Sequence, residues 1–75
     1  MTDVPVALPD PVQEIARSVR DRFRGMVQEL RIEPEGESVV LYGRAYSYYG
    51  KQMAQEAVIR SGRFSVRANR MDVIG

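Results

Sequence analysis

The sequence SVVLYGRAY, residues 38–46, decides the fold of this chain. Its β-branched and aromatic residues favour a β-strand, in which side chains alternate between two faces. One face carries Val39, Leu41, Gly43 and Ala45. The other face carries Val40, Tyr42, Arg44 and Tyr46. We expect the first face to lie against helices, with Gly43 beneath the small residues Ala54 and Ala57 of the segment that follows.

That following segment, residues 47–61, has the pattern of a helix. Ser47 is placed to cap its first turn and Gly62 to end it. Its predicted packed face consists of Gly50, Met53, Ala54, Ala57 and Val58. Residues 64–74 are rich in β-forming residues and predict a last strand, parallel to residues 38–46 because a helix connects the two. The apolar period of this strand slips, which predicts a bulge near Ala68 and Asn69.

The segment before residues 38–46 supplies a first helix and a first strand. Asp10 and Pro11 are typical of a helix start. An apolar helical stripe then consists of Val12, Ile15, Ala16, Val19 and Phe23, and Gly25 is a natural stop. Leu30 and Ile32 alternate with charged residues at strand period, and residues 34–37 read as a turn. Residues 1–9 form no periodic pattern and are expected to be a flexible arm.

Together these elements predict one α+β domain over residues 10–75. The expected architecture is a two-layer α-β-β-α-β sandwich, with a three-stranded mixed sheet and both helices on one face. No apolar run approaches the roughly 18 residues of a membrane span, and no secretory signal is visible. We therefore expect a cytoplasmic protein, for which peripheral association with a membrane stays open.

The composition argues against catalysis. The chain has no cysteine and no histidine, so disulfides, thiolate metal sites and the commonest general base are excluded. No phosphate-binding glycine motif is present. We expect a non-enzyme with no catalytic residues, no metal site and no cofactor. The formal net charge of +1 gives no strong field for nucleic acid.

Three segments resemble the BON domain, a small module of bacterial osmotic-stress and nodulation proteins, over residues 26–73. They are VVLYGRA at residues 39–45, the alanine-containing AQEA at residues 54–57, and SGRFSVRANRMDV at residues 61–73 with Asn69 at the family's asparagine. The resemblance implies a non-catalytic binding module. It also implies phospholipid or another anionic component of the cell envelope as the ligand.

Cationic and aromatic residues gather around the predicted start of the second helix, namely Arg44, Tyr46, Ser47, Tyr48 and Lys51. A helix N-terminus favours an anion, and tyrosines suit the interface between water and lipid. These residues are therefore the predicted ligand-binding site. The alternative is that Tyr49 covers the core while the others decorate a solvated turn.

Two further surfaces are candidates. Arg17, Arg20 and Arg24 follow one flank of the first helix, where they could touch phosphates or simply face solvent. Val40 and Tyr42 lie on the sheet face that the helices leave uncovered, with no proline or lysine to protect the edge of their strand. This predicts a protein partner or a homodimer, unless the arm covers them. Binding of single-stranded nucleic acid is a third hypothesis.

Overall fold

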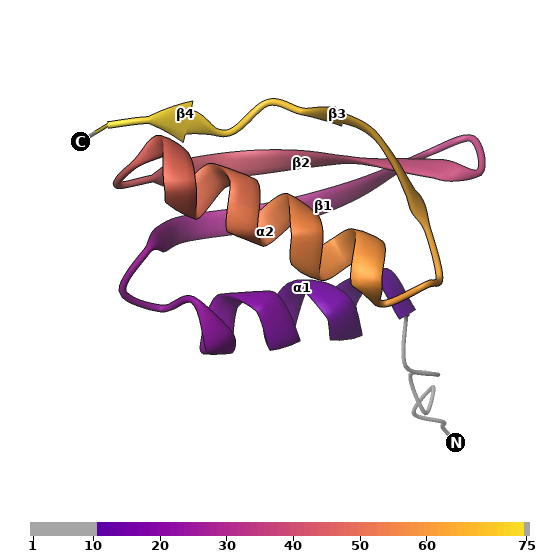
Figure 1. Ribbon diagram of the computed structural model, residues 1–75. Helices are drawn as coiled ribbons and strands as arrows, with labels where there is room; N and C mark the ends of the chain where they lie inside the picture. The colour runs from indigo at the N-terminus through magenta and orange to yellow at the C-terminus, as the bar shows by residue number, and fades with distance from the viewer. Residues whose placement is uncertain (1–10, 75) are drawn as a thin grey trace, which may run out of the picture.

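The computed structural model describes residues 11–74, which form two helices and one mixed sheet (Figure 1). The elements are α1 (Pro11–Arg22), β1 (Val27–Glu35), β2 (Ser38–Ala45), α2 (Tyr48–Arg60), β3 (Ser65–Asn69) and β4 (Asp72–Val73). The predicted arm, residues 1–9, and the predicted cap Asp10 lie outside the described residues. The α+β class and the order of the predicted elements are confirmed.

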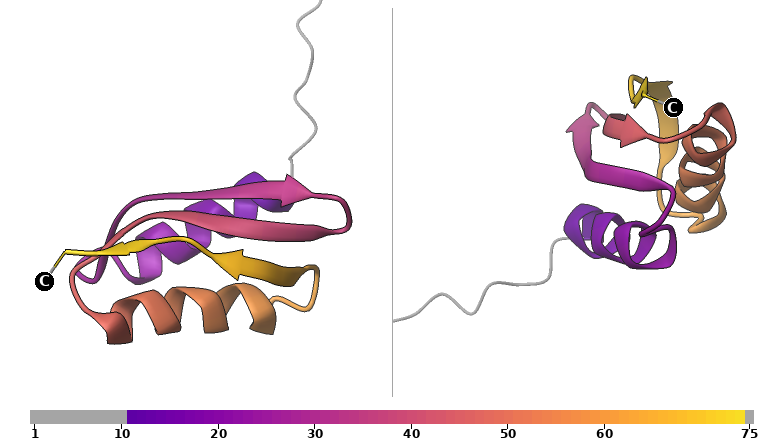
Figure 2. Two further views of the ribbon diagram at one scale, coloured as in Figure 1. Left: turned by 90° about the horizontal axis from the view of Figure 1, so that it is seen from above. Right: turned by 90° about the vertical axis from the view of Figure 1, so that its left-hand side faces the viewer.

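The strand β2 is the centre of the sheet. It pairs antiparallel with β1 on one side and parallel with β3 and β4 on the other. Both helices cover the same face, with α1 packed mainly on β1 and α2 on β3 and β2 (Figure 2). The prediction of three strands misses the short β4. The prediction that β2 has an open edge is wrong, because β2 has a partner on each side.

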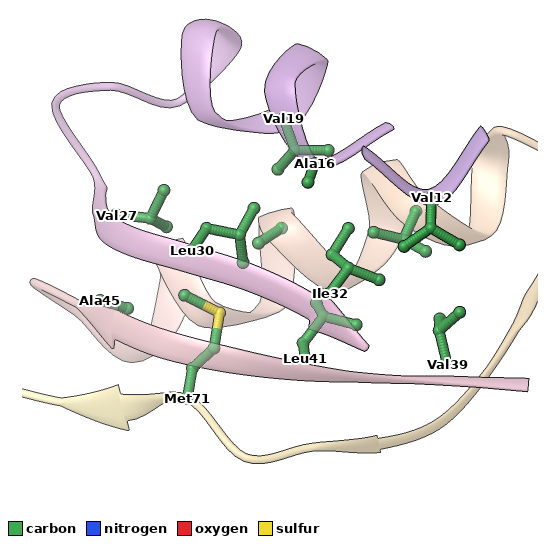
Figure 3. Close-up of a cluster of buried hydrophobic side chains, with 12 residues drawn as sticks. Val12, Ala16, Val19, Val27, Leu30, Ile32, Val39, Leu41, Ala45 and Met71 are labelled. Atoms are coloured by element: carbon green, nitrogen blue, oxygen red, sulfur yellow. The ribbon is translucent and has the colours of Figure 1, made fainter. Parts of the chain in front are cut away.

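The core lies between the helices and the sheet, where apolar side chains from α1, β1 and β2 point toward one another (Figure 3). Leu41 and Ala45 of β2 are fully buried, as their face of the strand predicts. The predicted stripe of α1 also faces inward, with Val12, Ala16 and Val19 buried. On α2, Gly50, Ala54 and Val58 are buried, which confirms the helix face that the sequence indicates.

A β-bulge interrupts the pairing of β1 with β2. Gln28 pairs with Arg44 and Arg31 with Tyr42, so two residues of β1, Glu29 and Leu30, lie opposite Gly43 alone. Glu29 has a positive φ of 57° and Gly43 a φ of 132°. Our expectation that Gly43 lies beneath α2 is therefore wrong: a Cβ atom at Gly43 would lie 2.7 Å from the carbonyl oxygen of Glu29.

The last strand is interrupted twice. Val39 pairs with Val66 and Val40 with Ala68, so Arg67 is the unpaired residue of a bulge, one position before the predicted one. The chain then leaves the strand at residues 70 and 71, and Asp72 resumes the pairing opposite Arg44. Met71, between the two short strands, is buried in the core. A strand this irregular can follow β2 without exposing a long, flat edge.

Candidate functional site

The outer face of the sheet, which the helices leave uncovered, is charged rather than apolar. Val40 was expected to project from it into solvent, but its side chain is only 3% exposed. Tyr42 is half-buried, and the guanidinium carbon of Arg31 lies 5.1 Å from the centre of its ring. Arg67 and Glu35 form an ion pair of 2.6 Å. Within residues 11–74, Val40 and Tyr42 therefore do not form the exposed apolar surface on which the predicted partner interface rested.

A depression lies on this outer face, with a volume of about 480 Å³. We call it the arginine depression. Its lining consists of Arg20, Glu29, Leu30, Arg31, Tyr42, Gly43, Arg44, Arg70 and Asp72. Four arginines against two carboxylates give it a local excess of two positive charges. It brings together Arg44 and Tyr42, which the sequence placed in different candidate sites.

Two lining arginines, Arg20 and Arg70, lie outside the predicted ligand-binding site. Arg20 of α1 reaches the depression by donating a hydrogen bond from Nη1 to the carbonyl oxygen of Leu30, at 3.0 Å. Arg24, on the same predicted basic flank, instead forms an ion pair with Asp21. Arg70 lies in the break between β3 and β4. The flank pattern could have indicated Arg20. The backbone N–H of Arg70 donates to the carbonyl oxygen of Leu41 in β2 at 2.8 Å, and Asp72 pairs opposite Arg44. The sequence predicted a parallel last strand here but not the register that places these two residues in the depression.

The second candidate surface is the end of the molecule where β2 enters α2. There β4 lies beside the loop that joins β2 to α2 (Figures 1 and 2), and the backbone N–H of Ile74 donates to the carbonyl oxygen of Ala45 at 2.8 Å. We call this surface the aromatic end; its large exposed side chains are Tyr46, Tyr48, Tyr49, Val73 and Ile74.

Of the predicted ligand-binding residues, Tyr46 and Tyr48 belong to the aromatic end and Arg44 to the arginine depression beside it. Tyr48 is 66% exposed, whereas the hydroxyl of Tyr46 donates to Oε1 of Gln28 at 3.2 Å. Lys51 is half-buried in the first turns of α2. Tyr49 is 64% exposed, so the alternative that it covers the core is wrong.

Ser47 caps the N-terminus of α2 at this end of the molecule. Its Oγ accepts a hydrogen bond from the backbone N–H of Gly50 at 3.0 Å, and its extended φ and ψ of −154° and 163° are those of an N-cap residue. The predicted cap is therefore confirmed. The hydroxyl is occupied by this bond, which makes Ser47 a residue that shapes the surface.

We expect Ser47→Ala to lower the free energy of unfolding by about 1 kcal/mol, because one N–H of the first turn loses its acceptor. Urea denaturation followed by circular dichroism measures the change. Ser47→Asp is the control, since a carboxylate caps as well as a hydroxyl does. Equal stability of the alanine variant and the native chain would contradict the capping role.

Residues 11–74 contain no group of three or more acidic side chains arranged to hold a metal ion. Within the same range, neither helix is long and apolar enough to cross a membrane.

The chain matches no protein-family model, and no curated protein or solved structure is similar to it at a significant level. The resemblance to BON domains therefore stays a prediction that rests on the three quoted segments.

Proposed function

We propose that this chain is a non-catalytic, BON-like binding module that docks on anionic phospholipid surfaces through its aromatic end. The observation that carries the proposal is the composition of that end. Exposed tyrosines and aliphatic residues stand next to cations, and the stretch from residue 44 to residue 55 contains no carboxylate. Tyrosine and aliphatic side chains suit the region where lipid headgroups meet acyl chains.

The cations add an attraction that depends on the charge of the lipid. Arg44 and Lys51 flank the exposed tyrosines, and each cation near an anionic membrane surface contributes about 1 kcal/mol. Apolar burial of Val73 and Ile74 adds to this, since each is still nearly half exposed. The sum supports weak, reversible binding that added salt should reduce.

Self-association is less favoured than it was from the sequence. The homodimer hypothesis rested on an open edge of β2 and on exposed side chains of Val40 and Tyr42, of which Tyr42 is half-buried. In the structure β2 is the central strand and Val40 is buried. Binding of single-stranded nucleic acid stays a weaker alternative, because the formal net charge of +1 gives no strong field for a polyanion.

Vesicle sedimentation tests the proposed function. We expect the chain to bind vesicles that contain phosphatidylglycerol and to bind vesicles of phosphatidylcholine alone much more weakly. Tyr48→Ser combined with Ile74→Ser should lower the partition coefficient at least tenfold, because the side chains that enter the lipid are removed. Lys51→Glu should weaken binding to the anionic vesicles only.

Ile59 supplies the matched control. It is 45% exposed, close to the 47% of Ile74, but it lies near the other end of α2 (Figure 1). Ile59→Ser should leave vesicle binding unchanged. Equal binding to neutral and anionic vesicles, or no binding to either, would refute the proposal.

A further inference from the structure

The arginine depression is built by the bulge of β1. Because Gly43 has no side chain, the backbone of Glu29 and Leu30 can approach it closely, and the Cα of Leu30 would lie 2.9 Å from any Cβ placed there. Gly43 and Leu30 both line the depression. A side chain at residue 43 would force these two strands apart. The glycine and the bulge residues opposite it thus form part of the wall of the depression.

Two of the four lining arginines are held in place before any ligand arrives. The hydrogen bond from Arg20 to the carbonyl oxygen of Leu30 fixes one guanidinium. Arg31 lies against the ring of Tyr42 and forms an exposed ion pair of 3.3 Å with Glu33. Guanidinium groups held in this way lose less conformational entropy when they bind a ligand.

The other two arginines, Arg44 and Arg70, have guanidinium N–H donors without a hydrogen-bond acceptor among residues 11–74. Arg44 has only a long contact, 3.8 Å from its Nε to Oε1 of Glu29, which exceeds hydrogen-bonding distance. The side chain of Arg70 makes no hydrogen bond or ion pair with any of residues 11–74. The depression therefore presents guanidinium donors that its own two carboxylates do not satisfy.

We propose that the arginine depression binds a phosphomonoester dianion, with Arg44 and Arg70 as its charge partners and Arg20 at the rim. Arginine forks match phosphate oxygens in pairs, and the four lining arginines outnumber the two lining carboxylates even though Arg31 also pairs with Glu33 outside the depression. A volume of about 480 Å³ exceeds the size of a bare phosphate and is typical of small-ligand sites. The ligand is thus a phosphorylated small molecule or headgroup. This site does not depend on membrane docking by the aromatic end.

Nuclear magnetic resonance titration with glycerol 3-phosphate tests the site. We expect saturable shifts at the backbone amides of Tyr42, Arg44 and Arg70. Arg70→Gln should weaken the affinity at least tenfold, while Arg63→Gln should change it less than twofold. Arg63 is an exposed arginine outside the depression, so both variants lose one charge. If Arg70→Gln does not fold, Arg44→Gln replaces it in the titration and should weaken the affinity for glycerol 3-phosphate in the same way.

Three results would overturn the proposal. One is the lack of saturable shifts at low ionic strength. Another is an equal loss of affinity in the Arg63 and Arg70 variants, which would indicate general attraction to a cationic surface. The last is equal affinity for glycerol 3-phosphate and for its methyl diester, because a diester carries a single charge.

Vesicles distinguish the two sources of the phosphomonoester. If phosphatidic acid in vesicles binds more tightly than glycerol 3-phosphate, and Ile74→Ser removes only that gain, the depression takes a lipid headgroup. Equal affinities support a soluble ligand. Ile74→Ser should leave the binding of glycerol 3-phosphate intact in either case, so failure of the membrane proposal and failure of this one are separable.

Discussion

Replacing Gly43 with alanine should lower the free energy of unfolding by about 2–6 kcal/mol, as the sum of two costs. The φ of 132° is one that residues with a Cβ atom rarely adopt. The new methyl group would also lie 2.7 Å from the carbonyl oxygen of Glu29 and 2.9 Å from the Cα of Leu30. Both neighbours are backbone atoms, which cannot rotate away as a side chain can.

The expected loss is large for a chain of this size. A domain of 75 residues has about 4–11 kcal/mol of stability in total, so Gly43→Ala should unfold a measurable fraction of molecules. Urea denaturation followed by circular dichroism measures the change. Gly36→Ala separates the two costs, because Gly36 also has a positive φ of 64° but nothing lies within 4 Å of its Cβ position. A Gly43 variant as stable as the Gly36 variant would refute the close-approach argument.

Gly43 also illustrates what the sequence could predict. The alternation of residues in β2 predicted which face Gly43 lies on. It could not predict why a glycine is needed there, because the bulge that requires it lies in the neighbouring strand β1. The sequence of β1 does contain an indication of this bulge. Val27, Leu30 and Ile32 are the buried residues of β1, and the first step of three residues breaks the strand period of two. A step of three residues also fits a helix, so this spacing alone does not distinguish a bulged strand from a continuation of α1.

The sequence predicted part of each surface. The alternation in residues 38–46 put Tyr42 and Arg44 on one face, where the structure has them. Arg20 and Arg70 come from elements far away in the sequence, and their meeting depends on the register of three strands and one helix. The two-residue β4 carries too little pattern to be recognised, although it supplies Asp72 to the depression and Val73 to the aromatic end.

The side chain of Asn69 connects α2 to the break between β3 and β4. Its Nδ2 donates to the carbonyl oxygen of Lys51 at 3.0 Å and to Oε1 of Gln55 at 3.2 Å. Its Oδ1 accepts from the backbone N–H of Met71 at 3.1 Å. One side chain thus links α2 to the point where the chain leaves β3. A side-chain amide suits this position, because its NH₂ group supplies both donated hydrogens and its oxygen supplies the acceptor.

We expect Asn69→Leu to lower the free energy of unfolding by about 2–4 kcal/mol, since three hydrogen bonds are lost and Met71 keeps an unsatisfied N–H. Asn69→Asp retains the acceptor for Met71 but directs a carboxylate at two oxygen atoms, so it should not restore stability. Gln55→Ala removes one of the three bonds and should cost about 1 kcal/mol. Urea denaturation of the three variants gives these values.

The same variants connect the fold with the proposed anion site. Arg70 and Asp72 flank Met71, so loosening the anchor at Asn69 should displace two lining residues of the arginine depression. We therefore expect Asn69→Asp, studied where it is still folded, to bind glycerol 3-phosphate several-fold more weakly than the native chain. Gln55→Ala, which leaves the bond to Met71 intact, should bind it normally. Native stability in Asn69→Leu would show that the break between β3 and β4 is held by the burial of Met71 alone.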